Sequence, residues 1–168
     1  MRKRASVYAT VLVLLVTLSL SLLTSCGEAT FTHAEYSISL PSDYDYLEDT
    51  DGVYDIAMSN GEAIIGVSRL SFVAADKTGI DISMMPSQFA AYYKAVSKVD
   101  STLEMTGDVP YYVYYLDKGG VKYTVLIAFH RSKHAYFTTT FTVRADAERR
   151  YISEFIDYAD NVIFDSKN

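Results

Sequence analysis

A pair of histidines is the first candidate for metal binding in this sequence. His130 and His134 are four residues apart and flank the segment Arg131-Ser132-Lys133. On a helix, this spacing would turn both imidazoles to one face, where they could bind a metal ion. Here two cations lie between them, and the β-branched and aromatic residues on either side predict strands joined by a turn. We therefore expect two exposed turn residues rather than a metal site.

Acidic residues are concentrated between Asp43 and Asp55, where six Asp and Glu side chains occur. Oxygen-rich loops of this kind attract calcium. The EF-hand spacing fails, however, because placing Gly52 at position six would put Leu47 and Met58 at positions one and twelve. A solvated acidic loop is the simpler interpretation, and a weak cation site is the alternative.

Tyrosine supplies a different chemistry, because it presents a large apolar surface with a polar tip at low entropic cost. Six tyrosines fall on two predicted elements: Tyr111, Tyr112, Tyr114 and Tyr115 on a strand, and Tyr92 and Tyr93 on a helix. One face of a sheet must pack, so about half of such residues belong to a core. Ordinary partly exposed tyrosines are the simpler interpretation, and a recognition surface formed by Tyr92, Tyr112 and Tyr114 is the alternative.

The amino terminus has the pattern of a secretory signal. Met1-Arg2-Lys3-Arg4 is basic, and no charged side chain occurs from Val7 to Leu23. The basic end stays in the cytoplasm, because charged groups are costly to insert into a bilayer. The apolar stretch is near the lower length limit for a spanning helix. A cleaved leader is therefore predicted over residues 1–25, and a permanent transmembrane anchor is the alternative.

The leader ends in Leu23-Thr24-Ser25-Cys26, which resembles the lipobox of bacterial lipoproteins. In that family the thiol is alkylated by a diacylglyceryl group and the signal peptide is cut just before the Cys. The resemblance implies that Cys26 is the lipid-anchored first residue of a mature protein held at the cell membrane, outside the cytoplasm. Cys26 is also the one cysteine of the chain, which excludes an intrachain disulfide. An ordinary secreted protein with a chance cysteine is the alternative.

The predicted mature chain is strongly acidic. Without the three basic residues of the leader, 12 basic side chains face 21 acidic ones, a net charge of −9. Nucleic acid and anionic lipid surfaces repel such a protein, so we expect no nucleic-acid partner. The remaining length suits one domain. We expect residues 26–32 to be the lipidated Cys and a short tether, and residues 33–168 to be the domain.

Strand patterns dominate the predicted domain. Apolar runs and alternations predict strands over residues 36–40, 53–59, 63–73, 103–105, 111–117, 121–130 and 135–143. Asn60-Gly61 and Lys118-Gly119-Gly120 each separate two such runs, which predicts hairpins because these turns require positive φ. Residues 75–81 are predicted as a polar loop, and residues 162–164 as a packed tail or an edge strand.

Helical periodicity occurs twice. Phe89, Tyr92, Tyr93 and Val96 repeat at helical spacing after Pro86, which suits the first turn of a helix. A second helix is predicted over residues 146–159, with an apolar stripe of Ile152, Phe155, Ile156 and Ala159 and with Arg149 and Arg150 facing away. These elements predict an α+β fold, a curved antiparallel sheet of six to eight strands whose apolar face packs against two helices.

Four segments carry a second resemblance: Tyr36-Ser37-Ile38-Ser39-Leu40-Pro41, the late strand Tyr136-Phe137-Thr138-Thr139-Thr140-Phe141, the helix after it, and Val162-Ile163-Phe164-Asp165-Ser166. Together they resemble the PsbP-like fold, a group that includes photosystem extrinsic proteins, DcrB-like bacterial lipoproteins and a Ran-binding protein. The group has no shared enzyme activity. The resemblance therefore implies an accessory or binding protein and assigns no functional residue.

Signatures of catalysis are missing from the sequence. It contains no Gly-x-Ser-x-Gly elbow, and Gly119-Gly120 is too short to cradle a phosphate. We expect no catalysis and no cofactor, and we predict a membrane-anchored accessory or binding lipoprotein of the cell envelope with a protein partner. A small envelope enzyme and a purely structural or assembly lipoprotein are the alternatives.

Overall fold

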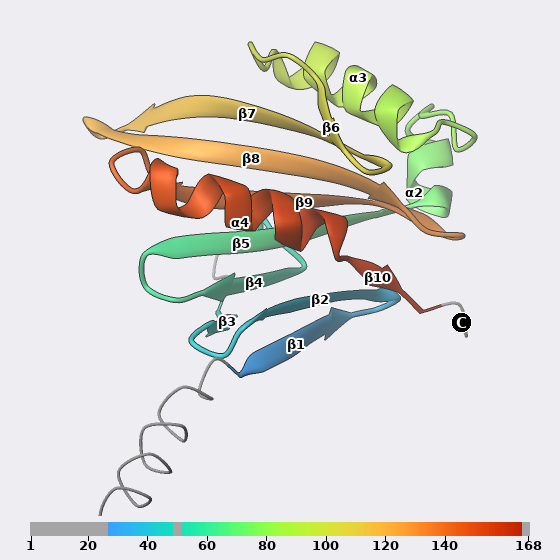
Figure 1. Ribbon diagram of the computed structural model, residues 1–168. Coiled ribbons are helices and arrows are strands. Elements are labelled where there is room, and N and C mark those ends of the chain that lie inside the picture. The colour runs from blue at the N-terminus through green and yellow to red at the C-terminus, as the bar shows by residue number, and fades with distance from the viewer. Residues whose placement is uncertain (1–26, 49–51, 166–168) are drawn as a thin grey trace, which may run out of the picture.

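The computed structural model describes residues 27–48 and 52–165 (Figure 1). The predicted leader and Cys26 lie outside these residues. A three-stranded sheet has the order β1 (Glu28–His33), β2 (Tyr36–Pro41) and β10 (Ile163–Phe164). A seven-stranded sheet has the order β3 (Asp45–Leu47), β4 (Ile56–Ser59), β5 (Ala63–Ser71), β9 (Ala135–Arg144), β8 (Val121–Arg131), β7 (Val109–Lys118) and β6 (Glu104–Thr106). The helices of this part of the chain are α2 (Phe72–Lys77), α3 (Pro86–Ser97) and α4 (Glu148–Asp160).

Both faces of the seven-stranded sheet are covered, because its central strands are apolar on both sides. On β8, Leu126 packs into a core formed with the three-stranded sheet and α4. The next residue, Ile127, packs into a second core under α3. In Figure 1, α3 lies above β7 and β8, whereas α4 and the β1–β2 hairpin lie on the other side. The predicted α+β class is confirmed, with a smaller second sheet added to the predicted layers.

The two longer helices form where their sequences predict. Pro86 begins α3, and the side chain of Gln88 accepts a hydrogen bond of 2.8 Å from the Met85 amide just before it. Helix α4 buries Phe155 and Ala159 from the predicted stripe and leaves Arg149 and Arg150 exposed, as expected. The tail strand β10 pairs with β2 at the edge of the smaller sheet.

Three local predictions were wrong. The expected tether is strand β1, which pairs along its whole length with β2 although Phe31 is its one fully buried side chain. The acidic segment contains β3, which pairs with β4. The strand predicted to reach residue 73 stops at Ser71, because its hydroxyl accepts a hydrogen bond of 3.2 Å from the Ala74 amide and caps α2.

The described residues contain no helix that combines the length and the apolar character required to cross a bilayer.

Candidate functional site

A pocket lies where the start of β1, the end of β2 and helix α4 meet. Two adjoining cavities of about 570 and 330 Å³ share Gly27, Pro41 and Tyr158 in their walls. We name the smaller one the Tyr44 pocket, and its lining residues are Gly27, Pro41, Ser42, Asp43, Tyr44, Asn60, Arg150, Tyr151, Glu154 and Tyr158. The Gly27 carbonyl accepts a hydrogen bond of 2.8 Å from the Ser42 amide, which fixes the beginning of the described chain beside this pocket.

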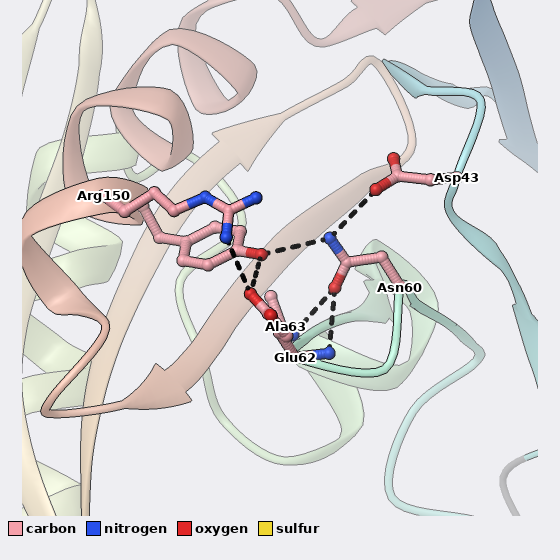
Figure 2. A network of polar contacts seen from close by, with 6 residues as sticks. Asp43, Asn60, Glu62, Ala63 and Arg150 are labelled. Atoms are coloured by element: carbon pink, nitrogen blue, oxygen red, sulfur yellow. Dashed lines mark hydrogen bonds and ion pairs between the residues drawn. The ribbon is translucent and has the colours of Figure 1, made fainter.

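One wall of the Tyr44 pocket is the turn between β4 and β5, and Asn60 organises it (Figure 2). The Asn60 Oδ1 atom accepts hydrogen bonds from the backbone amides of Glu62 at 3.1 Å and Ala63 at 2.9 Å. Its Nδ2 atom donates to Asp43 Oδ2 at 3.4 Å and to the Tyr151 hydroxyl at 3.3 Å. A single amide side chain therefore connects the turn to the loop after β2 and to α4.

Helix α4 contributes the charged rim of the pocket (Figure 2). The Tyr151 hydroxyl donates a hydrogen bond of 2.8 Å to Glu62 Oε2. Arg150 Nη1 lies 3.1 Å from the same oxygen, and its guanidinium carbon lies 5.1 Å from the centre of the Tyr151 ring. Both side chains of this ion pair are mostly exposed, so the pair lies at the mouth of the pocket. Glu62 balances the charge of Arg150 there.

The Tyr44 hydroxyl is the unusual group of this site. The Tyr44 side chain is only 3% exposed, and its oxygen has no hydrogen-bond partner among the described residues. Burial raises the pKa of Tyr44 well above its ordinary value, and neighbouring Tyr158, Tyr151, Asp43 and Glu154 raise it further. Such an unpartnered buried hydroxyl costs about 1–3 kcal/mol of stability.

Two carboxylates give the pocket a negative charge. Asp43 and Glu154 both line it, and neither forms an ion pair within residues 27–48 and 52–165. Burial, followed by the charges of Glu154 and Asp43, raises the pKa of Tyr158 to about 12. The phenols therefore stay protonated at neutral pH. This arrangement suits a cation that also donates hydrogen bonds.

The predicted tyrosine surface is only partly exposed. Tyr112 is 1% exposed and packs against Phe129 with its ring centre 5.8 Å away, so it is a core residue and its assignment to a surface was wrong. Tyr114 is half-buried beside it, and Tyr92 on α3 is 37% exposed. Of the predicted surface, Tyr92 and Tyr114 therefore remain available to a partner.

The histidine prediction was wrong for one member of the pair. His134 is exposed in the turn after β8, as expected. His130 is 4% exposed, and its ring centre lies 6.3 Å from that of Tyr36 and 5.9 Å from that of Phe164. Burial lowers the pKa of His130 to about 4, and its Nε2 atom has no hydrogen-bond partner in the described chain. Strand β8 is covered on both faces, so His130 points into the core rather than into the turn.

Among the described residues, no three side chains of His, Cys, Asp or Glu come together as metal ligands would. Asp43, from the acidic segment, instead lines the Tyr44 pocket, and Asp55 accepts a hydrogen bond from the Arg69 amide. Residues 49–51 of the segment lie outside the described chain.

The sequence interpretation missed Tyr44, Tyr151 and Tyr158. Tyr151 and Tyr158 are seven residues apart on α4, and this spacing places both on one helix face. That signal was present in the sequence. Tyr44 joins them only through the packing of the loop after β2 against α4, for which no local pattern exists.

Comparisons with known proteins identify the fold. No family model and no curated protein matches the sequence. A solved structure from Bacteroides thetaiotaomicron aligns with a TM-score of 0.59 at 17% identity, over 84% of this chain and 50% of the other. This chain thus spans only half of that protein.

Two further solved structures match over most of their own length. One is cyanobacterial PsbP from Synechocystis, with a TM-score of 0.51 and 13% identity over 83% of this chain and 94% of the other. The other is LpqN, involved in cell envelope biogenesis of Mycobacterium tuberculosis, with a TM-score of 0.49 and 11% identity over 82% of this chain and 90% of the other. The chain therefore has the fold of cyanobacterial PsbP, as the resemblance of the four segments implied.

Proposed function

We propose that this protein is a lipoprotein of the bacterial cell envelope, a non-catalytic binding module anchored to the membrane by a lipid on Cys26 and facing away from the cytoplasm. The lipobox at residues 23–26 supports the anchor. The observation that carries the binding role is the position of the Tyr44 pocket, whose wall includes Gly27, the residue after Cys26.

Adjacent Cα atoms are about 3.8 Å apart, so the anchor would hold this pocket at the membrane surface. The hydrogen bond between the Ser42 amide and the Gly27 carbonyl leaves little slack between anchor and domain. Two or three acyl chains bury enough methylene groups for durable attachment. The pocket would therefore meet ligands in the headgroup region rather than in free solution.

The anchor is tested by metabolic labelling with palmitate and by mass spectrometry of the amino terminus. We expect the native protein to begin at an acylated Cys26 and to incorporate the label. The Cys26→Ser variant should keep its leader and take up no label, whereas the matched control Ser25→Gly should be processed, because it keeps a small residue before the cut. An unmodified thiol behind an intact leader would refute the proposal.

A protein partner is the second candidate function, supported by the surface between α3 and β7. A cavity of about 620 Å³ there is lined by Tyr93 and Tyr114, and the neighbouring Tyr115 is 65% exposed. Crosslinking in intact cells should capture a partner that the Tyr92→Ala and Tyr114→Ala variants lose. Equal capture by both variants would eliminate this surface, and a broad aromatic contact without a pocket ligand would favour an assembly role.

A further inference from the structure

We propose that the Tyr44 pocket binds a primary ammonium group, and that this ammonium belongs to a zwitterionic phospholipid headgroup beside the anchor. The proposal deepens the proposed function and rests on it for the lipid source. The ammonium chemistry itself rests on three acceptor groups in the pocket.

The first argument is the unbalanced charge of the pocket. Arg150 is the basic side chain among the lining residues, and it is already paired with Glu62 at 3.1 Å. Asp43 and Glu154 contribute two carboxylates without an ion-pair partner in the described chain. A bound cation would restore the balance, whereas an anion would add to the repulsion.

The second argument is the unpartnered hydroxyl of Tyr44. A buried polar atom of this kind is expected to have a hydrogen-bond partner. A primary ammonium has three N–H donors, and the pocket has three acceptors without a cationic partner: the Tyr44 oxygen and the carboxylates of Asp43 and Glu154. Tyr44 and Tyr158 also line the pocket, and aromatic side chains attract cations.

The third argument concerns the source of the ammonium. Gly27 lines the pocket, so a lipid on Cys26 would bring headgroups to its mouth. The predicted mature chain has 12 basic and 21 acidic side chains, and anionic headgroups would be repelled. A headgroup that joins an ammonium to a phosphodiester has no net charge, and the Arg150 guanidinium at the rim has N–H donors besides the one directed at Glu62.

The test uses purified full-chain protein in nonionic detergent, titrated with glycerophosphoethanolamine, a phosphodiester without net charge, and followed by tyrosine difference absorbance. Binding should weaken about tenfold in Tyr44→Phe and at least tenfold in the Asp43→Asn, Glu154→Gln double variant. Tyr92→Phe on α3 is the matched control and should bind like the native protein. Glycerophosphocholine, which also has no net charge, should bind at least tenfold more weakly, because its quaternary nitrogen has no N–H donor.

Equal binding by the native protein and both pocket variants would overturn the proposal, as would equal binding of glycerophosphocholine. Circular dichroism checks the fold of the double variant, and Tyr44→Phe retains the packing in any case. Since the soluble ligand needs no anchor, this titration also succeeds in Cys26→Ser, which separates failure of the pocket from failure of the proposed lipidation.

A second arm tests the lipid source with native protein in vesicles that contain either phosphatidylethanolamine or phosphatidylcholine. A photoreactive group on the ethanolamine headgroup should label the segment that contains Tyr44. Free glycerophosphoethanolamine at saturating concentration should reduce this labelling. Binding of the soluble amine without labelling by the lipid would overturn the lipid source and would identify a free amine as the ligand.

Discussion

Both ends of strand β2 lie beside a buried polar atom that has no hydrogen-bond partner in the described chain, and the surroundings of the two atoms are opposite. Near Tyr36, the His130 Nε2 atom is enclosed by the aromatic rings of Tyr36 and Phe164. Near Pro41, Tyr44 lines a cavity of about 330 Å³ whose wall also includes Asp43 and Glu154. Aromatic rings enclose one atom, whereas the residue that carries the other lines a pocket together with two carboxylates.

The carboxylates at the two ends differ in the same way. Glu35, just before β2, is 6% exposed, accepts a hydrogen bond of 2.8 Å from the Ser132 hydroxyl and lies 3.4 Å from Arg69 Nε. Asp43 and Glu154 have no such cation within the described residues. The Tyr36 end is therefore closed by packing and pairing within the fold, whereas the Pro41 end is where we propose that a further group binds.

The largest effect expected at the two ends of β2 is a pH dependence caused by His130. Its pKa is about 4 in the folded protein, below the ordinary value of 6.5, because burial disfavours the charged imidazolium. The unfolded chain therefore binds the proton first, and stability should fall by about 3 kcal/mol as the pH falls from 6.5 to 4. Urea denaturation over this range measures the loss. The His130→Leu variant should lose less stability than the native protein over this pH range. Equal losses in the two proteins would contradict the burial of His130.

A smaller effect is expected for Glu35. Burial alone would raise its pKa, but the hydrogen bond from Ser132 and the charge of Arg69 outweigh burial and lower it. The charged form therefore stabilises the fold above the ordinary pKa of 4.5, and this contribution is lost as the pH falls through the lower folded value.

Glu35→Gln should accordingly lower the free energy of unfolding by about 2 kcal/mol at pH 7. The difference from the native protein should shrink below pH 4.5. A difference that stays constant down to pH 3 would show that the charge of Glu35 does not matter.

At the Pro41 end of β2, removal of a polar group should raise the free energy of unfolding rather than lower it. Tyr44→Phe removes a buried hydroxyl that has no partner, so it should raise the free energy of unfolding by about 1 kcal/mol in the absence of ligand. Thermal denaturation of the ligand-free protein measures this change. Tyr151→Phe is the matched comparison and should be destabilising, because the Tyr151 hydroxyl donates to Glu62 at 2.8 Å. A destabilised Tyr44→Phe would mean that the hydroxyl is already satisfied.

The smallest effect is expected on α3. Tyr92 is 37% exposed, and its replacement by Ala should change the free energy of unfolding by less than about 0.5 kcal/mol. Tyr112→Ala, in the core beneath the same helix, should lower it by about 3–5 kcal/mol. Chemical denaturation of the two variants side by side separates the exposed tyrosine from the buried one, and similar losses would contradict this division.

Local signals were sufficient to predict most of the fold from the sequence. Gly61, Gly119 and Gly120 all adopt positive φ in the hairpins where they were expected. The apolar stripe of α4 identified the helix that covers the larger core. Strand β1 was missed because an edge strand buries few side chains, here chiefly Phe31. Its sequence therefore resembles that of a polar linker.

The candidate site was much harder to predict, because long-range packing creates it. Tyr44 and Tyr158 belong to segments far apart in the sequence, and neither segment has a motif that indicates the other. His130 shows the same difficulty: its burial depends on Tyr36 and Phe164, which come from both ends of the described chain. The acidic segment was recognised, but the chemistry of Asp43 depends on its place beside α4.

The most direct test of the account is to determine which end of the molecule faces the membrane. Native protein can be reconstituted in bilayers with and without a spin-labelled lipid, and its backbone amide signals compared by NMR. We predict strong paramagnetic broadening at Gly27, Ser42 and Asn60, beside the Tyr44 pocket, and little broadening along α3. Broadening that is strongest on α3, or uniform over the domain, would contradict the claim that the anchor holds this pocket at the membrane.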